Sequence, residues 1–177
     1  MPGKILNKKF FDRPTIDVAE DILGKFLVRK RGSKMIAYMI TEVEAYDGPR
    51  DKASHASRGR TARNIPMFGP AGYWYVYFTY GIHWMLNIVT GPEDYPAAIL
   101  IRGVEGINGP ARVTKALHIN NGFNDKTASI KTGMWIEDRG MPVSKKSIKR
   151  VARVGVDYAG KYWSGRKYRF ILMHSIK

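Results

Sequence analysis

Alternation of apolar and polar positions predicts two neighbouring β-strands early in the chain, over residues 25–30 and 35–45. Apolar side chains fall at every second position of these stretches, at Phe26 and Val28 and then at Ile36, Tyr38 and Ile40. A period of two is typical of a strand with one buried face. The four residues between the stretches, Arg-Gly-Ser-Lys, have the composition of a turn. We therefore predict a hairpin.

Helical spacing replaces this alternation in two other segments. Before the hairpin, apolar residues recur at Ile16, Ala19, Ile22 and Leu23, with Thr15 available as the N-cap and Gly24 as the stop. We assign that helix a structural role. Further along, Gly109-Pro110 begins a second predicted helix, with proline in its first turn and Val113 and Leu117 on one side.

A run of aromatic residues predicts another strand over residues 72–81, followed by apolar strands over 82–90 and 97–104. Along the aromatic run, one face is expected to carry Tyr73, Tyr75 and Tyr77, and the opposite face Trp74, Val76 and Phe78. The second set has the composition of a core. The tyrosines could offer amphipathic rings for stacking a base, or could simply pack.

Length and composition favour one folded domain spanning residues 1–177. With 44% hydrophobic and 12% aromatic residues, the chain can bury a sizeable core, and it contains neither repeats nor an obvious linker. No apolar run approaches the roughly 18 residues that span a bilayer, and the N-terminus lacks a signal-like segment. We expect a cytoplasmic protein. The absence of cysteine excludes disulfides, thiolate nucleophiles and zinc sites built on cysteine.

Charge narrows the choice of partner. Thirty Lys and Arg against fifteen Asp and Glu give a formal net charge of +15 and a pI near 10.1. Such a field attracts polyanions and releases their counterions on contact, so nucleic acid is the expected partner. A basic surface that only keeps the protein in solution is the alternative.

Glu42 and Glu44 lie two residues apart at the end of the predicted strand 35–45. If the alternation persists, both project from one face and continue the row of Ile36, Tyr38 and Ile40. A carboxylate at the edge of a core is partly desolvated, and its pKa can rise toward the range of a general base. Alternatively, the strand emerges into solvent there, or one glutamate pairs with an arginine. Spacing leaves these readings open.

A lone histidine and three arginines follow the glutamates. His55 has no metal-ligand spacing to the histidines at 83, 118 and 174, so we assign no metal, and a lone histidine is more often a satisfied polar residue than a catalyst. The nearby arginines would each gain from a phosphate but would repel one another in a solvated loop; they are Arg58, Arg60 and Arg63.

Three further features carry potential chemistry. Tyr80, just before Gly81, lies where the aromatic strand should turn, so it could wedge into a base stack or merely cover the rim of the core. Arg102 interrupts an apolar run and must reach water, pair, or meet a ligand. The densest basic cluster could be a phosphate-contacting face or a solvated helix surface; it comprises Lys145, Lys146, Lys149, Arg150 and Arg153.

Several segments together resemble one known family, and the resemblance runs from Phe10-Phe11-Asp12 to Arg169-Phe170. Its most specific parts are Glu42-Val43-Glu44-Ala45-Tyr46, Arg63-Asn64 with Met67-Phe68, Tyr75-Val76-Tyr77 to Tyr80-Gly81, and Arg153-Val154-Gly155-Val156. In order and spacing the chain is similar to the alkylpurine (3-methyladenine) DNA glycosylases of the alkyladenine type. This resemblance implies an α+β fold, a single compact mixed domain with a largely antiparallel β-sheet core and surrounding helices, without a helix-hairpin-helix motif.

The resemblance also implies roles for individual residues. Glu44 would activate the water, Arg102 would help to place it together with a backbone carbonyl at Val154, and Glu42 would have no chemical role. For the extruded base, the matching residues are Tyr46 and Tyr77 as the sandwiching rings, His55 at the pocket edge, and Asn87 as the side chain that restricts which purines fit. For the DNA, Tyr80 would occupy the gap left in the duplex, and Arg60 and Arg63 would contact phosphates.

The implied function is a monofunctional DNA glycosylase that flips alkylated or deaminated purines out of double-stranded DNA and hydrolyses the N-glycosidic bond, leaving an apurinic site in base excision repair. It would act as a monomer without cofactor or metal, in the cytoplasm, associated with the nucleoid in a prokaryote or inside the nucleus in a eukaryote. A non-catalytic nucleic-acid-binding domain is the alternative. A metal-dependent nuclease is less favoured because the sequence offers no His/Asp cluster.

Overall fold

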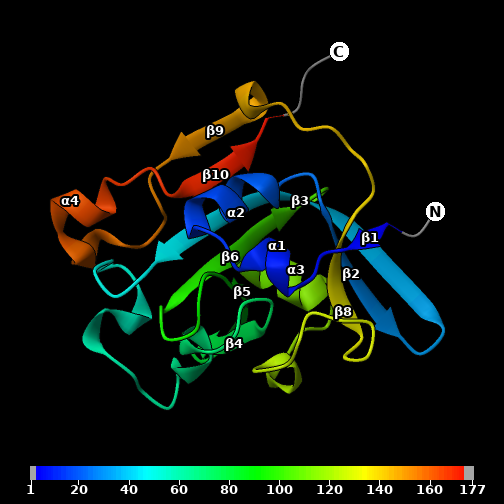
Figure 1. Ribbon diagram of the computed structural model, residues 1–177, viewed down its shortest axis with the longest axis horizontal. Coiled ribbons are helices and arrows are strands. Elements are labelled where there is room, and N and C mark those ends of the chain that lie inside the picture. The colour runs from blue at the N-terminus through cyan, green and yellow to red at the C-terminus, as the bar shows by residue number, and fades with distance from the viewer. Residues whose placement is uncertain (1–2, 174–177) are drawn as a thin grey trace.

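The computed structural model describes residues 3–173, in which one large β-sheet is flanked by short helices (Figure 1). The strands are β1 (Lys4–Ile5), β2 (Phe26–Arg31), β3 (Lys34–Asp47), β4 (Trp74–Thr79), β5 (His83–Val89), β6 (Ala97–Val104), β7 (Ile107–Asn108), β8 (Met134–Asp138), β9 (Ile148–Val151) and β10 (Arg169–Leu172). The α-helices are α1 (Lys8–Phe11), α2 (Thr15–Asp21), α3 (Pro110–Ala116) and α4 (Gly160–Ser164). Single 3₁₀ turns are η1 (His55–Arg58), η2 (Ile65–Phe68), η3 (Asn121–Phe123), η4 (Lys145–Ser147) and η5 (Asp157–Ala159).

All of the strand pairings between these elements are antiparallel. The main path of the sheet runs β1-β8-β2-β3-β6-β5-β4, while β10 joins β3 to the short strand β9, and β7 pairs with β6. The long strand β3 is the hub, since it pairs with β2 along its first half and with β6 and β10 along its second half. The predicted α+β class with a largely antiparallel sheet is confirmed.

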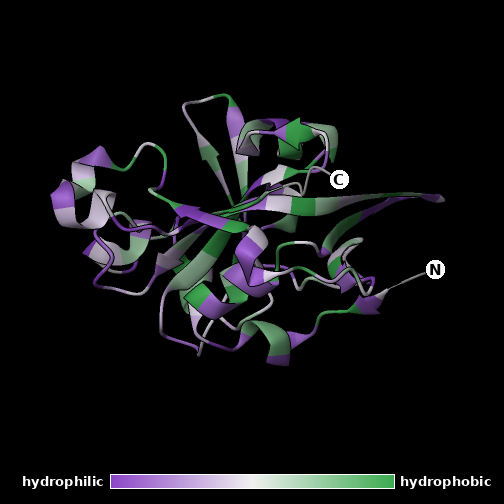
Figure 2. Ribbon diagram, turned by 90° about the horizontal axis from the view of Figure 1, so that it is seen from above, coloured by the Kyte–Doolittle hydropathy of each residue, from purple (hydrophilic) through white to green (hydrophobic). Residues whose placement is uncertain are grey.

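The predicted β2–β3 hairpin is present and projects from the body of the molecule (Figure 1), with a hydrophilic tip (Figure 2). Arg31 pairs with Lys34, so the turn contains two residues rather than the four expected. Gly32 supplies the positive φ, 59°, that a two-residue turn requires.

The central strand β3 contains a bulge at Thr41. Ile40 pairs with Val104 whereas Glu42 pairs with Gly103, the next residue along β6, so Thr41 is an extra residue on β3. An extra residue shifts the register by one and sends the side chains that follow to the other face of the sheet.

This bulge overturns one expectation about the glutamates. Ile40 and Val43 lie three residues apart, and both belong to the main core with Ala45. The apolar row of β3 therefore continues through Val43, and Glu42 and Glu44 project from the opposite face. They still share a face with each other, because both carboxylates reach the same nitrogen of Arg102.

The main core fills one face of the sheet and is closed by helices. α2 packs against β3 and β6, and α3 packs against β5 and β6. Figure 2 shows apolar segments gathered along the central strands and the helices beside them. The largest fully buried side chains of this core include Phe11, Ile22, Leu27, Trp74, Leu86, Ile88, Ile99, Ile101 and Phe170.

Two local predictions are wrong. Thr15 is the first residue of α2 rather than its cap, which is Pro14, and its hydroxyl instead accepts a hydrogen bond of 3.1 Å from Thr90. Phe78 was expected in the core with Trp74 and Val76, but it is 43% exposed because the end of β4 extends beyond the core, where its ring contacts Trp84.

None of the helices within residues 3–173 is long and apolar enough to cross a membrane.

Because of the bulge, Ile40 and Val43, which lie three residues apart on β3, should both stabilise the core. Ile40→Ala should lower the free energy of unfolding by about 2–5 kcal/mol, and Val43→Ala by about 2 kcal/mol, because each removes a fully buried side chain. Met35→Ala on the same strand, 66% exposed, should change it by less than about 0.5 kcal/mol. Urea denaturation measures all three. A Val43→Ala effect as small as that of Met35→Ala would contradict the bulged register.

Candidate active site

A cavity of about 290 Å³ opens on the face of the sheet opposite the main core. The alternation along β6 shows this arrangement, since Leu100 and Arg102 line the cavity while Ile99 and Ile101 lie in the core. A larger cavity of about 580 Å³ lies by α1 and α2, but acids and bases in its wall are paired with each other, as in Lys25–Asp138 and Arg13–Asp21. We therefore centre the site on the smaller cavity.

Glu44 lies in the wall of this cavity with its side chain fully buried. Its Oε1 accepts the backbone N–H of Val154 at 2.7 Å and lies 3.5 Å from Nε of Arg102, and its Oε2 accepts the hydroxyl of Tyr46 at 2.9 Å. Burial raises the pKa of Glu44, and the opposing effects of Arg102, the Val154 N–H and the Tyr46 hydroxyl do not cancel that rise. The carboxylate is thus held in place and kept more basic than an exposed glutamate.

Glu42 has a different environment. Its Oε1 accepts hydrogen bonds of 3.1 Å from Nε of Arg102 and 3.1 Å from Nη1 of Arg169, so it pairs with two arginines. This matches the alternative in which one of the glutamates pairs with an arginine. Arg102 is the residue that β6 leaves without a partner on β3, because Glu42 pairs with Gly103 and Val43 with Ile101. The irregular register therefore lets Arg102 lie between the two glutamates.

Aromatic rings form much of the cavity wall. Tyr46 extends from β3 and Tyr77 from β4, and Tyr75 lies 5.2 Å from Tyr77 between ring centroids. The His55 ring meets Tyr77 edge-on at 4.7 Å, and its Nδ1 shares a hydrogen bond of 3.1 Å with the hydroxyl of Tyr75. Burial raises the pKa of Tyr75 to about 12, and the pKa of Tyr46 and of Tyr77 is raised as well, so all three phenols stay neutral.

His55 and Asn87 complete this wall as polar groups. Desolvation against the tyrosines, together with the charge of Arg63, lowers the pKa of His55 and keeps the imidazole neutral near pH 7. Asn87 lies on β5, only 3% exposed, and donates to the backbone carbonyl of Tyr75 at 3.1 Å. That hydrogen bond fixes the amide in the lining of the cavity.

Tyr80 lies at the tip of the β4–β5 hairpin and is 86% exposed, so it does not cover the rim of the core. Its φ is 53°, an unusual value for a residue other than glycine, which the three-residue connection from Thr79 to His83 imposes. The ring is thereby carried on the β4–β5 hairpin at the mouth of the cavity.

The arginines of the 58–63 loop are not equivalent. Arg63 is exposed, donates to the backbone carbonyl of Phe78 at 2.9 Å and lies 5.0 Å from the centre of the Tyr77 ring. Arg60 lies away from the cavity, where it is ion-paired with Asp94 and packed over Phe68. A basic groove of about 1000 Å³ adjoins the cavity and shares His55 and Tyr158 with it. Its lining contains no acid, and its cations are Arg50, Lys52, Arg58 and Arg63.

The basic cluster near the C-terminus is not the solvated helix surface that was one of its two expected forms, and its contact with phosphates stays a prediction. Lys145 and Lys146 belong to η4, and Lys149 and Arg150 to the strand β9, so the segment is not a helix. Arg153 is not on the surface at all, because its side chain is fully buried against Asp51. Sequence reasoning missed this pair: 102 positions separate the two residues, and no periodicity connects them.

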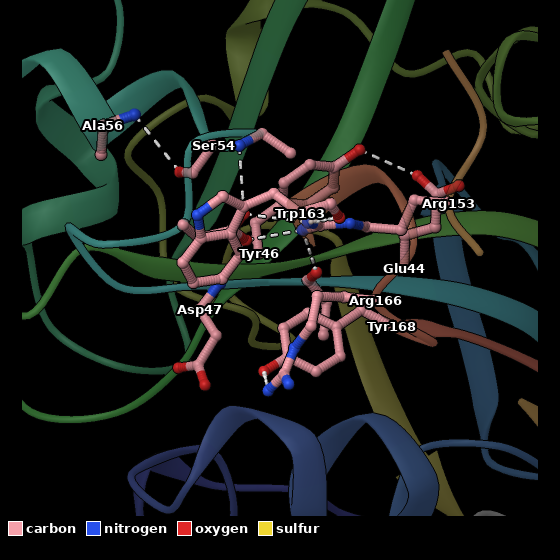
Figure 3. Close-up of polar contacts among 12 residues, drawn as sticks. Glu44, Tyr46, Asp47, Ser54, Ala56, Arg153, Trp163, Arg166 and Tyr168 are labelled. Atoms are coloured by element: carbon pink, nitrogen blue, oxygen red, sulfur yellow. Dashed lines mark hydrogen bonds and ion pairs between the residues drawn. The ribbon is translucent and has the colours of Figure 1, made fainter. Parts of the chain in front are cut away.

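Arg153 links the Asp51 loop to the cavity wall. Its guanidinium forms two hydrogen bonds to Asp51, of 2.5 and 2.9 Å, and donates to the carbonyls of Ala45 and Trp163. It also lies 4.8 Å from the centre of the Tyr46 ring (Figure 3). The next residue, Val154, is the one that donates to Glu44. One buried ion pair thus fixes two neighbours of the glutamate.

Tyr158 was also missed as a component of the site. It lines both the cavity and the basic groove, and its hydroxyl donates to the carbonyl of Ala53 at 2.7 Å. Within residues 3–173, no three His, Asp or Glu side chains lie close enough together to hold a metal ion; His174 lies outside the described residues.

Comparison with known proteins gives consistent matches. A model of the methylpurine-DNA glycosylase (MPG) family matches residues 9–108 and 105–176. Two proteins named "Putative 3-methyladenine DNA glycosylase", from Methanocella arvoryzae and Streptomyces avermitilis, are each 41% identical, over 89% and 88% of this chain and 87% and 83% of theirs. A protein of the same name from Legionella pneumophila is 38% identical over 94% of this chain and 93% of its own.

The hydrogen bond from Tyr46 predicts a shift in the titration of Glu44. Tyr46→Phe removes a donor to the ionised carboxylate, so the pKa of Glu44, already raised by burial, should rise further. A ¹³C NMR titration of the side-chain carboxyls measures this, with the signal assigned by its loss in Glu44→Gln. Tyr95→Phe, which removes a hydroxyl bonded to Asp47, is the matched control and should leave Glu44 unchanged. An unchanged or lowered pKa in Tyr46→Phe would refute the hydrogen bond.

Proposed function

The chain belongs to the methylpurine-DNA glycosylase family, and on that premise we propose that it hydrolyses the N-glycosidic bond of damaged purines in duplex DNA, alkylated or deaminated, with a water activated by Glu44. It is a hydrolase that acts on DNA and processes alkylated bases. One observation carries the finer proposal: a fully buried carboxylate, with a raised pKa, in the wall of an aromatic cavity.

Access to such a cavity requires base flipping. A purine within a duplex has its glycosidic bond out of reach, so the nucleotide rotates out of the stack and its base enters the cavity. Tyr46 and Tyr77 then hold the base between them, His55 lies at its edge, and Asn87 crowds the exocyclic amino group of normal guanine. A damaged base that pairs poorly costs least to extrude, which contributes to selection.

The strand that loses its base needs support. Tyr80 lies at the mouth of the cavity on the β4–β5 hairpin, and its exposed ring fills the vacated position in the stack. Arg63 lies in a groove with four cations and no acid, suited to the phosphates beside the flipped nucleotide. Arg60 is not part of that groove, so we assign it a phosphate contact outside it. To make this contact, Arg60 would have to leave its ion pair with Asp94.

Hydrolysis proceeds at the sugar. Glu44 takes a proton from a water whose oxygen bonds to C1′, while the bond between C1′ and the base breaks and its electron pair leaves with the base. The carboxylate also stabilises the positive charge that develops on the sugar ring. Arg102 and the Val154 carbonyl hold the water. This role for Arg102 is supported by its side chain, which uses only Nε for hydrogen bonding to the described residues.

The proposal leads to expectations about cofactors, subunits and the charge of the preferred purine. The proposed reaction uses only water, DNA and the side chains of one chain, so it requires neither a cofactor nor a second subunit. Electron-rich tyrosine faces attract cations, so purines that carry positive charge after alkylation should bind better than neutral ones. The remaining alternative, a non-catalytic nucleic-acid-binding domain, would have no use for a basic carboxylate beside the cavity.

Glu44→Gln should lower the rate of base release by about 10²–10⁴-fold, the contribution of a positioned general base, while leaving DNA affinity nearly unchanged. The assay incubates the protein in EDTA with duplexes that carry 7-methylguanine, hypoxanthine or 1,N⁶-ethenoadenine and reveals apurinic sites with alkali. Glu137→Gln replaces another buried glutamate, 3% exposed and on β8, and should retain full activity. Release from none of these duplexes by the native protein would refute the proposal; undiminished turnover in Glu44→Gln would refute the assigned base.

Tyr80→Ala should weaken release from duplex DNA by about tenfold or more, because the vacated stack loses its replacement ring. Release of the same lesion from single-stranded DNA should change little, since no stack needs filling there. Comparing single-turnover rates on the two substrates isolates the wedge. Equal losses on both would instead assign Tyr80 to the pocket or to general binding.

A further inference from the structure

Each tyrosine proposed to hold the base has a guanidinium against it. Arg63 lies 5.0 Å from the centre of the Tyr77 ring, and Arg153 lies 4.8 Å from the centre of the Tyr46 ring. Arg153 is not among the residues that line the cavity, and its side chain has no exposed surface. It therefore lies behind Tyr46, with the ring between the guanidinium and the cavity.

The two cations differ in how their charge is balanced. Arg63 is exposed, so water and salt screen it. Arg153 has no water to screen it, and its charge is met instead by the buried carboxylate of Asp51. Asp51 is itself fixed, because it accepts the backbone N–H groups of Asp47 and Ala53, each at 3.1 Å.

A cation behind an aromatic ring affects what the ring can bind in front. The negative face of Tyr46 attracts a positively charged base, but an unbalanced guanidinium on the other face would both draw on the ring's electrons and repel that base. Such repulsion is strong where the dielectric constant is low. A carboxylate in bidentate contact with the guanidinium makes the pair close to neutral when viewed from the cavity.

On the basis of the proposed function, we propose that the buried Asp51–Arg153 pair sets the preference of the site for positively charged over neutral purines, with Asp51 cancelling the cation behind Tyr46. Arg153 then serves as a rigid support that fixes the ring through Ala45 and Trp163 and delivers the Val154 N–H to Glu44. Asp51 allows it to do so without repelling a cationic base. Neither residue touches the substrate.

The alternative is that the pair only holds the 48–53 loop and the segment after β9 together. Loss of a purely structural clamp would slow the release of every lesion by a similar factor. Loss of charge balance would slow cationic lesions selectively. The ratio of rates for two lesions therefore separates the two roles.

The test measures single-turnover release of 7-methylguanine, which is cationic, and of hypoxanthine, which is neutral, from the same duplex sequence. Asp51→Asn should lower the ratio of the two rates by about fivefold, the size of one cation–π interaction, since Arg153 remains charged and unbalanced. Adding Arg153→Gln should return the ratio to the native value or above, because the cation is then gone. A ratio that stays constant in both variants, whatever the absolute rates, would overturn the proposal.

A matched control lies on the far side of the molecule, where Arg13 packs 4.6 Å from the centre of the Phe10 ring and pairs with Asp21 at 2.9 Å. Asp21→Asn should leave the ratio unchanged. If Asp51→Asn does not fold, as judged by circular dichroism, Arg153→Gln alone replaces it: the Asp51 carboxylate is then no longer balanced behind Tyr46 and favours a cationic base, so the ratio should rise, and an unchanged ratio would refute the proposal. If the native protein releases neither lesion, the proposed function fails instead.

Discussion

Glu44 has no solvent-exposed surface, and an ionised carboxylate in such a place must receive hydrogen bonds that the fold brings to it. They come from Tyr46 on the same strand and from Val154 near the end of the chain, and Arg102 on the adjacent strand adds a positive charge. These groups hold the carboxylate without restoring all that it loses by leaving water, and its pKa remains raised. The arrangement of the cavity, the ion pairs and the loops around it can be understood as the means of burying this one group.

Two irregularities in the sheet make that burial possible. The extra residue Thr41 lets β3 serve the core with Ile40 and Val43 while its glutamates face the other way. Arg102 on β6 has no strand-pairing partner on β3, and its guanidinium lies within reach of both glutamates. A regular ladder would have continued the row of Ile40 into Glu42 and Glu44 and placed two carboxylates in an apolar core, which no nearby cation could compensate.

Local sequence patterns correctly predicted those elements whose structure depends only on residues close together in the chain. The strand 97–104, the helix starting at Pro110 and the exposed tip at Tyr80 needed only alternation, a helix-start signal and a turn residue. The bulge at Thr41 was not predictable, because its composition resembles that of any strand. The Asp51–Arg153 pair was not predictable either, since it joins segments that only the tertiary fold brings together. The roles proposed for Glu44, Tyr46, Tyr77 and Asn87 came from resemblance to a family, and the structure adds the contacts from which those proposals are argued.

The position of β10 has a consequence for how the protein is made. Its residues 169–171 pair with Glu44, Val43 and Glu42, so the last strand of the sheet seals the edge beside the glutamates. On a ribosome, which synthesises the chain from its N-terminus, the strand that carries Glu44 emerges more than a hundred residues before Val154 and β10. During that interval two parts of its folded environment, the Val154 N–H and β10, are still absent. The raised pKa of Glu44 therefore depends on segments that are made late, and a product that ends before Val154 carries the same glutamate without the burial that shifts its pKa.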